Sequence, residues 1–473
     1  MPEVRGAEAA IGKLQVAFTT HLGTASFLVF LLFGSVVYMN TWNTEFFLDG
    51  IHLIQTYDSA ALREALTGNW EPNNWETPGY RPLSALFNHV RALLFGEFVL
   101  GHRFLLVALM ALSLSMLTRA GVALGVGYQA AIGAGVLLLA APNNYYHIAW
   151  LSDGVHIVPT LFGALAIFAA AHPDLRWRWA AIHGGGMAAL LAREEGVAFY
   201  AVAVIVALLR GPGPWWRRLL AYALPAGLLV LGFLLARAEL VPEAAGPGRS
   251  KGAIDGYYYT WSHSAKHALN FMALRSEVGR HVWSGLLVVL VVRGMILARA
   301  PRRSAIALYF GFALIASAPL ALVYRENIVI APSYFAAVVV AMCVESTVRR
   351  AGRIPGGVLL AGCAVVLVLM IRENRVYQEI FHPYSAAALE SQAWVLGDRN
   401  VSIPDERRER LSRRLREVGV PDVPYDAVRP EAEELVERCR ERRHPDGEEP
   451  FLARRHQWIY RASGLTADQQ AVP

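Results

Sequence analysis

Residues 22–39 read LGTASFLVFLLFGSVVYM, a run without a single charged side chain. A helix needs roughly 20 mainly apolar residues to cross the hydrocarbon core of a bilayer, so the run predicts a membrane span. Arg5 and Lys13 precede it, as basic residues precede the apolar part of a secretory signal. The run lacks a convincing small-residue cleavage site, and more apolar runs follow. We therefore interpret residues 22–39 as an uncleaved first span.

Further apolar runs fill most of the chain after the first one. Hydrophobic residues make up 55% of the sequence and charged residues 17%, and the mean hydropathy is +0.34, which is too apolar for an ordinary soluble protein. The sequence therefore predicts an all-α fold, a polytopic transmembrane helical bundle of about eleven spans. These spans lie near 22–39, 103–118, 128–142, 155–172, 179–192, 195–210, 219–237, 282–298, 304–323, 328–347 and 356–372.

The positions of arginine set the predicted orientation, because short cytoplasmic loops are enriched in Lys and Arg. With the N-terminus inside and the spans counted alternately, every inner hairpin loop contains arginine, whereas the outer turn Pro142–Gly154 contains neither Lys nor Arg. The arginines of the inner loops are Arg119, Arg176, Arg178, Arg210, Arg217, Arg218, Arg299, Arg302, Arg303, Arg349, Arg350 and Arg353.

The density of charge divides the chain into two predicted regions. Residues 1–372 form the transmembrane domain, with large extracytoplasmic loops at 40–102 and 241–281. Residues 373–473 alternate amphipathic Arg/Glu-rich stretches with Pro and Gly breaks, which predicts a small helical C-terminal soluble region. The hairpin count places this region outside the cytoplasm. Its many arginines would by themselves suggest the inside, but long tails follow the charge rule poorly.

Composition also excludes several classes of protein. The three cysteines, Cys343, Cys363 and Cys439, have no metal-ligand spacing, and two of them lie in apolar runs, so neither a disulfide framework nor a zinc site is expected. The pI of about 9.2 reflects arginines outside the membrane, and no basic-aromatic stripe of the nucleic-acid-binding kind is present.

Asp49 stands just past the first span, in the segment Phe46-Phe47-Leu48-Asp49-Gly50-Ile51-His52. An acid beside a membrane is costly in hydrocarbon, so it favours a functional cavity at the surface. Glu45 would share a helical face with Asp49, and Asp58 lies in the same acid-containing segment. The alternative is that Asp49 only caps a helix or lies at the interface.

The stretch Ser84–Gly96 is apolar but is interrupted by Asn88, His89 and Arg91, so it is too short and too charged to span. We expect a helix that lies in the membrane interface and flanks a cleft at the surface.

Polar and aromatic residues gather in the loops of the predicted outer face, which favours a cavity there over a set of merely wet loop ends. Tyr258 and Trp261, with Lys266 nearby, could stack against a sugar or lipid headgroup, or form an aromatic belt. The other residues of this face that we single out are Arg81, His147, Asp153, Arg193, Glu194, Glu195 and Arg325.

Several of these segments together resemble the GT-C superfamily of integral-membrane glycosyltransferases, whose members use polyprenyl-phosphate sugars. The sequence resembles the protein O-mannosyltransferase and aminoarabinose-transferase members in particular. The resemblance covers about residues 20–372 and departs from the usual pattern at Gly50, where many members carry a second acid, and at Asn327-Ile328, where a tyrosine is expected. The matching segments are the acid at Asp49, Tyr80-Arg81-Pro82-Leu83, Leu94-Phe95-Gly96, Ala149-Trp150-Leu151-Ser152-Asp153, Leu190-Leu191-Ala192-Arg193-Glu194-Glu195 and Arg325 through Ser333.

The resemblance implies transfer of a hexosyl or pentosyl group from a lipid-phosphate donor to a lipid, glycan or protein acceptor on the extracytoplasmic side. Such transfer needs a base near the acceptor and cations for the departing phosphate. Asp49 is then the candidate base, and Arg193, Arg325 and Arg81 are candidate phosphate ligands. Each of these arginines has an alternative role. Arg193 and Arg325 could form ion pairs with Glu194, Glu195 or Glu326, and Arg81 could anchor the chain at the membrane interface.

The residues leave other functions open. A lipid-linked-sugar flippase or transporter, an envelope polymer ligase and an inactive membrane scaffold are the alternatives, although no inverted repeat of the transporter kind is evident. No cofactor is certain, and a divalent cation is compatible with the superfamily. We expect an integral protein of a bacterial cell membrane that has no nucleic-acid partner.

Overall fold

The computed structural model describes residues 21–42, 46, 53–70, 79–141, 146–242, 277–317, 330–351 and 353–380, together with 405, 406, 409 and 413. Nearly all of the predicted C-terminal region 373–473 and of the loop 241–281 lies outside the described residues. The same is true of six candidate site residues: Glu45, Asp49, Tyr258, Trp261, Lys266 and Arg325.

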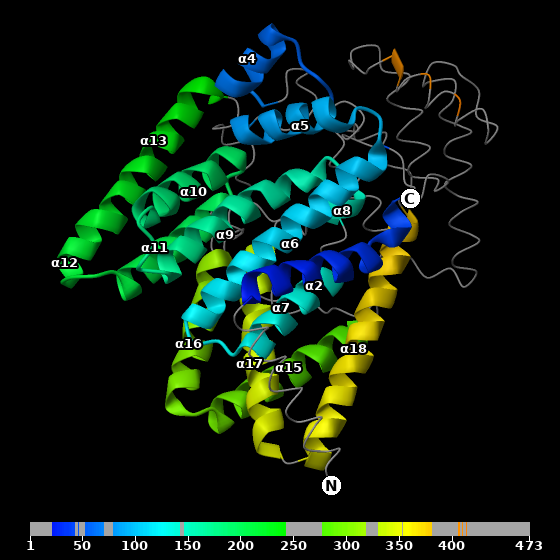
Figure 1. Ribbon diagram of the computed structural model, residues 1–473, viewed down its shortest axis with the longest axis vertical. Helices are drawn as coiled ribbons and strands as arrows, with labels where there is room; N and C mark the ends of the chain where they lie inside the picture. The colour runs from blue at the N-terminus through cyan, green and yellow to red at the C-terminus, as the bar shows by residue number, and fades with distance from the viewer. Residues whose placement is uncertain are drawn as a thin grey trace.

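Helices make up the regular structure throughout the described part of the chain, which confirms the all-α prediction (Figure 1). Each of the eleven predicted spans falls on a helix. These helices are α2 (Leu22–Val37), α6 (Val99–Ala123), α7 (Tyr128–Ala140), α9 (Ile157–Ala171), α10 (Arg178–Ala192), α11 (Gly196–Arg210), α13 (Leu224–Leu240), α15 (Glu277–Leu297), α16 (Ala300–Ser317), α17 (Ile330–Ala351) and α18 (Arg353–Ile380).

Shorter helices connect the long ones. The connecting elements are η1 (Met39–Thr41), α4 (Ser59–Thr67), α5 (Pro82–Phe95), α8 (Tyr146–Ala149), η3 (Asp153–His156), α12 (Trp215–Arg218) and η4 (Leu219–Ala223), the last of which has π-helical geometry.

Five helical stretches within the described residues are long and apolar enough to cross a membrane. They are Val99–Ala123, Gly154–Ala171, Trp215–Leu240, Ile330–Arg350 and Pro355–Arg372. Shorter apolar helices accompany them, among them α2, α7 and α11. The chain is therefore an integral membrane protein, and the number of crossings and their orientation stay predictions.

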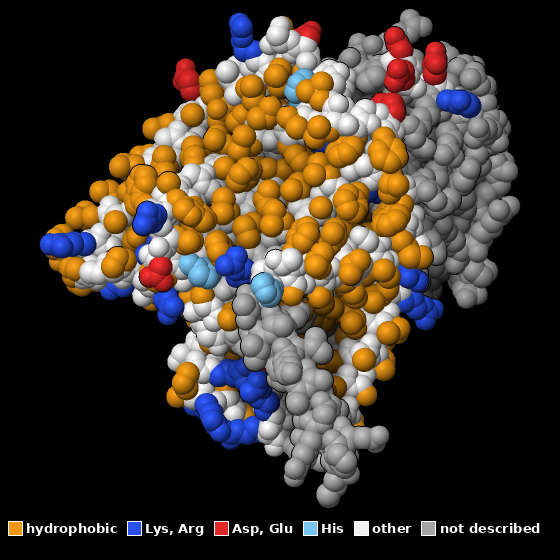
Figure 2. All heavy atoms as spheres, viewed as in Figure 1, with side chains coloured by type: hydrophobic (Ala, Val, Ile, Leu, Met, Phe, Trp, Pro, Cys, Tyr) orange, Lys and Arg blue, Asp and Glu red, His pale blue; other side chains and the backbone are white. Residues whose placement is uncertain are grey.

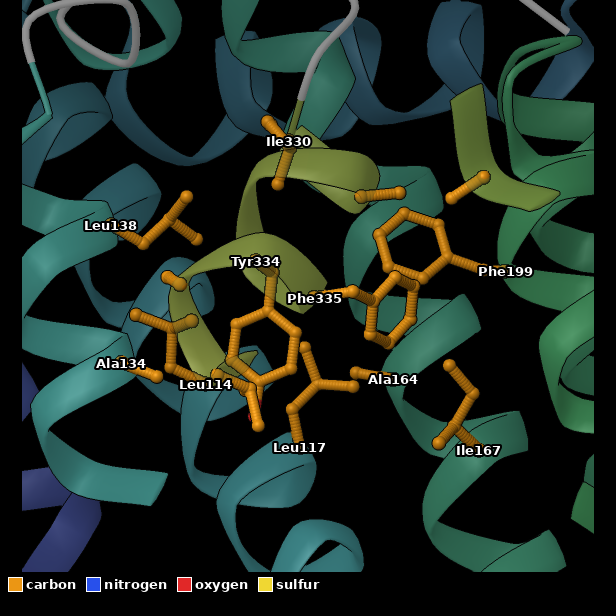
Figure 3. Close-up of a cluster of buried hydrophobic side chains, with 14 of the residues drawn as sticks. Leu114, Leu117, Ala134, Leu138, Ala164, Ile167, Phe199, Ile330, Tyr334 and Phe335 are labelled. Atoms are coloured by element: carbon orange, nitrogen blue, oxygen red, sulfur yellow. The ribbon is translucent and has the colours of Figure 1, made fainter. Parts of the chain in front are cut away.

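The middle of the bundle is built around α9, which packs against α6, α10 and α11. Small residues bring these helices close together: a Cβ at Gly163 would lie 2.3 Å from the Cβ of Phe199. Figure 3 shows Phe199 of α11 beside Phe335 of α17, with Leu114 and Leu117 of α6 nearby. These side chains are buried and tie α17 to the other helices.

The outer surface of the bundle is apolar, as lipid contact requires. Only 17% of the most apolar window of α12–α13 and 11% of that of α18 is buried, against 94% for α17. Figure 2 shows apolar side chains spread over most of one face, with charged side chains toward its margins. Leucines of α13 such as Leu228, Leu231 and Leu235 are exposed, so this helix borders the lipid for most of its length.

Helix α5 is amphipathic in the sense opposite to that of a soluble protein. Its buried face consists of small and polar residues, whereas Val90, Leu93 and Leu94 on the other face are exposed. The residues of the buried face are Pro82, Ser84, Ala85, Asn88, Arg91 and Ala92. An apolar face turned outward suits lipid, and α5 lies across one end of the bundle, where it packs on α10 (Figure 1). The expected helix at Ser84–Gly96 is confirmed, with bounds of Pro82–Phe95.

Candidate functional site

The connection between α10 and α11 consists of three charged residues, Arg193, Glu194 and Glu195. Arg193 is extended, with φ of −160° and ψ of 151°, and ends α10. Gly196 opens α11 so close to α10 that a Cβ would lie 2.3 Å from the carbonyl group of Ala189. The tight turn thus sets three charged side chains side by side at one end of the bundle.

Glu194 binds arginines from two other parts of the chain. Arg81, the residue that precedes α5, donates from Nε to Glu194 Oε2 at 3.1 Å. Arg237, near the end of α13, places Nη2 3.5 Å from Oε1 of the same carboxylate. The guanidinium group of Arg81 also lies 5.3 Å from the ring centroid of the buried Trp70, which fixes its orientation.

These arginines determine the charge state of Glu194. Burial alone would raise the pKa of its carboxyl group, but the positive charges of Arg81, Arg193 and Arg237 outweigh burial and lower that pKa from 4.5 to about 2. Glu194 is therefore ionised at neutral pH.

Glu195 binds a buried histidine. Its Oε1 lies 2.5 Å from Nδ1 of His156, and its Oε2 lies 3.7 Å from Nε of Arg193. The ring of His147 lies 5.1 Å from that of His156, measured between centroids. Burial would raise the pKa of Glu195, but the charge and hydrogen bond of His156 and the charge of Arg193 lower it below its usual value.

Helix α5 covers this end of the bundle with its polar face. Ser84 Oγ donates to the carbonyl oxygen of Ala192 at 2.7 Å, directly before the charged connection. Arg91 Nη2 donates to the carbonyl oxygen of Leu151 at 2.8 Å, in the turn that holds His147 and His156. The helix therefore joins the two turns that carry the charged side chains.

The structure brings five of the candidate residues into one group. We call this group the Arg–Glu cluster and include the two partners that the structure adds, His156 and Arg237. Its members are Arg81, His147, His156, Arg193, Glu194, Glu195 and Arg237.

Asp58 stands apart from these contacts. Asp58 Oδ1 accepts the backbone N–H groups of Ala60 and Ala61 at 2.9 and 2.8 Å, so Asp58 caps α4. The backbone of Asp153 begins η3, the short helix that holds His156.

His156 and Arg237 escaped the sequence analysis although both carry a signal. His156 comes two residues after the polar turn Pro142–Gly154 that holds His147, and Arg237 is the one charged residue of the predicted span 219–237. An ionisable residue inside a span usually faces the bundle rather than the lipid, which points toward partners such as these.

No group of three or more His, Cys, Asp or Glu side chains that could hold a metal ion occurs among the residues that the structure describes. The two acids of the cluster bind arginine and histidine instead.

Comparison with known proteins yields similarities of structure. No family model and no curated protein matches the sequence. The structure of ArnT from Cupriavidus metallidurans bound to undecaprenyl phosphate is similar, with a TM-score of 0.44 and 16% identity, over 86% of this chain and 75% of that one. An Archaeoglobus fulgidus oligosaccharyltransferase, tethered with an acceptor peptide, has a TM-score of 0.43 and 12% identity, over 83% of this chain and 59% of that one.

Both similarities are low in sequence identity and concern the arrangement of the helices. The roles of single residues depend on their own contacts.

Proposed function

We propose that the protein is a glycosyltransferase that moves a sugar from a polyprenyl-phosphate donor to a lipid, glycan or protein acceptor on the extracytoplasmic side of a bacterial cell membrane. The observation that carries the proposal is the Arg–Glu cluster. In it, arginines from three separate elements converge at one end of a bundle whose outer surface is apolar.

This arrangement suits an amphiphilic donor. The long apolar chain of a polyprenyl phosphate stays in lipid, and its phosphate group needs cations at the surface of the membrane. Arginine binds phosphate through a planar fork of N–H donors, and three arginines meet two glutamates among the described residues of the cluster. Glu194 and Glu195 hold the guanidinium groups in place, so a donor would meet positioned ligands.

The resemblance supplies the roles, and the contacts of the cluster support those of Arg81 and Arg193. The acceptor's hydroxyl or amine attacks the anomeric carbon of the sugar, and the bond from that carbon to the phosphate oxygen breaks. The electron pair leaves with the polyprenyl phosphate, whose charge Arg81, Arg193 and Arg325 would bind, and Asp49 would take the acceptor's proton. Further residues are proposed to contact the substrates: Glu45, Asp58, His147 and Asp153. Glu194 and Glu195 would act by holding the arginines. The second large loop would contribute Tyr258, Trp261 and Lys266.

The direct test is to incubate the purified protein with a panel of undecaprenyl-phosphate sugars and to measure donor consumption. Arg193→Gln should lower donor consumption by about a hundredfold or more, because it removes a charge-assisted ligand of the leaving group. Asp49→Asn should have a comparable effect. Arg299→Gln serves as the matched control, since Arg299 is exposed in the turn between α15 and α16, away from the cluster.

Each possible outcome bears on the proposal. Turnover that survives Asp49→Asn would remove Asp49 from the mechanism, and turnover that survives Arg193→Gln would remove the cluster. If no donor is consumed while a lipid-linked sugar crosses the membrane of proteoliposomes, the protein is a flippase. If neither reaction occurs with any donor, glycosyl transfer is the wrong function.

A further inference from the structure

Two neighbouring turns and the helix ends beside them combine exposed tryptophans with exposed arginines. Both turns lie at the end of the bundle remote from α5 (Figure 1). The first turn joins α9 to α10, and the second joins α11 to α12. The tryptophans Trp177, Trp179, Trp215 and Trp216 are between 46% and 68% exposed, which is unusual for the largest side chain. We call the set the indole–arginine platform, and it consists of Arg176, Trp177, Trp179, Arg210, Trp215, Trp216 and Arg217.

The fold holds the two turns against each other. Trp179 Nε1 donates to the carbonyl oxygen of Ala221 at 2.9 Å. Ala221 belongs to η4, whose π-helical geometry frees carbonyl oxygens from the ordinary helical ladder. The buried Arg178 reinforces the junction, because it donates to Tyr222 Oη at 3.2 Å and to the carbonyl oxygen of Ala170 at 2.8 Å. The platform is therefore built from two turns with fixed positions.

The exposed arginines of the platform make no ion pair with a described residue. Arg176, Arg210 and Arg217 are all exposed, and the guanidinium group of Arg217 stacks 5.1 Å from the ring centroid of Trp216. Asp174 is the one acid in the two turns, and it is exposed. The platform thus carries an excess of positive charge among the described residues.

The neighbouring arginine-rich turns at the ends of α15–α18 differ from the platform. There Glu345 pairs with both Arg302 and Arg349, at 2.5 and 2.6 Å, and Arg303 donates to the carbonyl oxygens at the end of α15. The sequence of these turns, residues 298–303 and 351–354, contains no tryptophan. Arginine-rich turns are therefore common at this end of the bundle. Among the described residues, exposed arginines occur together with exposed tryptophans in the platform alone.

We infer that the platform binds the headgroup of an anionic glycerophospholipid of the surrounding membrane. Indole rings prefer the level of the lipid headgroups, where their apolar face and their N–H group both find partners. Arginines held at that level attract a phosphodiester, and each one near an anionic surface strengthens binding about fivefold. The site is distinct from the Arg–Glu cluster and would hold a lipid that is not a substrate.

The test compares two variants of equal charge in the full-length protein. Arg176→Gln/Arg210→Gln/Arg217→Gln removes the platform's exposed arginines, and Arg293→Gln/Arg299→Gln/Arg350→Gln removes three exposed arginines of α15, of the turn after it and of α17. The delipidated proteins are titrated with dioleoyl phosphatidylglycerol or dioleoyl phosphatidylcholine in detergent, and bound lipid is counted by native mass spectrometry. The platform variant should bind phosphatidylglycerol about 100-fold more weakly than the wild type, and the control variant should retain most of its affinity.

A second measurement needs no variant. In nanodiscs, brominated phosphatidylglycerol should quench the tryptophan fluorescence of the wild type more than brominated phosphatidylcholine at equal mole fraction. Equal quenching by the two lipids, or equal losses of affinity in both triple variants, would mean that the platform is an ordinary interfacial belt and would overturn the inference. Displacement of the lipid by millimolar inorganic phosphate would also overturn it, since the site would then recognise free phosphate.

Discussion

Glu194 is held by two arginines from distant parts of the chain, so its replacement by glutamine probes how strongly the Arg–Glu cluster ties the bundle together. The drop in its pKa from 4.5 to about 2 corresponds to about 3 kcal/mol of net attraction. Because the side chain is 30% exposed, solvent screening reduces the expected loss of folding free energy to about 2 kcal/mol. The substitution would also remove the carboxylate to which Arg81, a side chain only 8% exposed, donates.

A double-mutant cycle isolates the pairwise part of this loss. Arg81→Gln, Glu194→Gln and the double variant are unfolded by titration with denaturing detergent in mixed micelles, and the free energies of unfolding are compared. We expect a coupling energy of about 1–2 kcal/mol, since the cycle also excludes the contribution of Arg237. Glu64→Gln on the exposed side of α4 is the control and should change stability by less than about 0.5 kcal/mol. A coupling below about 0.5 kcal/mol would refute the reasoning, because the pair would then behave as an ordinary surface ion pair.

Three further predictions concern the same end of the bundle. The stability difference between the wild type and Glu194→Gln should be full above pH 4.5 and should shrink as the pH falls toward 2, because a lowered pKa contributes its full stability only above the pKa of the unfolded chain and loses it progressively as the pH falls through the pKa of the folded protein; unfolding at several pH values measures it. His156→Gln should raise the pKa of Glu195, because it removes the strongest attraction that keeps that carboxylate ionised, so the acid limb of the pH–activity profile should move to higher pH; an unchanged limb would separate the pair from the reaction. Gly196→Ala should lower the Tm and abolish donor consumption because its Cβ would collide with the backbone of α10, whereas Gly232→Ala, which points into open space, should leave both unchanged.

The spans were predictable because an apolar run of sufficient length has few alternatives to a membrane helix. The ends of the spans were less so. The run at 103–118 is the centre of α6, which begins at Val99 and includes His102 and Arg103; both are buried, and Arg103 Nη2 donates to the carbonyl oxygen of Ala149. Hydropathy treats such residues as the end of a span, whereas a buried hydrogen bond lets the helix continue.

The candidate site shows the same division between local and distant information. The three charged residues between α10 and α11 could be predicted from sequence, because they interrupt two apolar runs. The partner of Glu195 could not, since His156 reaches it only through the packing of α9 against α10 and α11. Arg193 Nε lies 3.7 Å from Oε2 of Glu195, one of the acids named as its alternative partner, and its role toward a phosphate stays a prediction. The roles of Asp49 and Arg325 stay predictions, because both lie outside the described residues.

Helix α13 contributes Arg237 to the cluster, yet only Ala226 and Phe233 of its residues are buried. A helix bordered mainly by lipid takes its tilt from the thickness of the hydrocarbon layer as well as from its neighbours. The distance between Arg237 and Glu194 is consequently a property of the protein and its bilayer together. We therefore expect a membrane that thins or thickens to move Arg237 relative to Glu194 without altering one residue, so that lipid composition would act on any chemistry performed there.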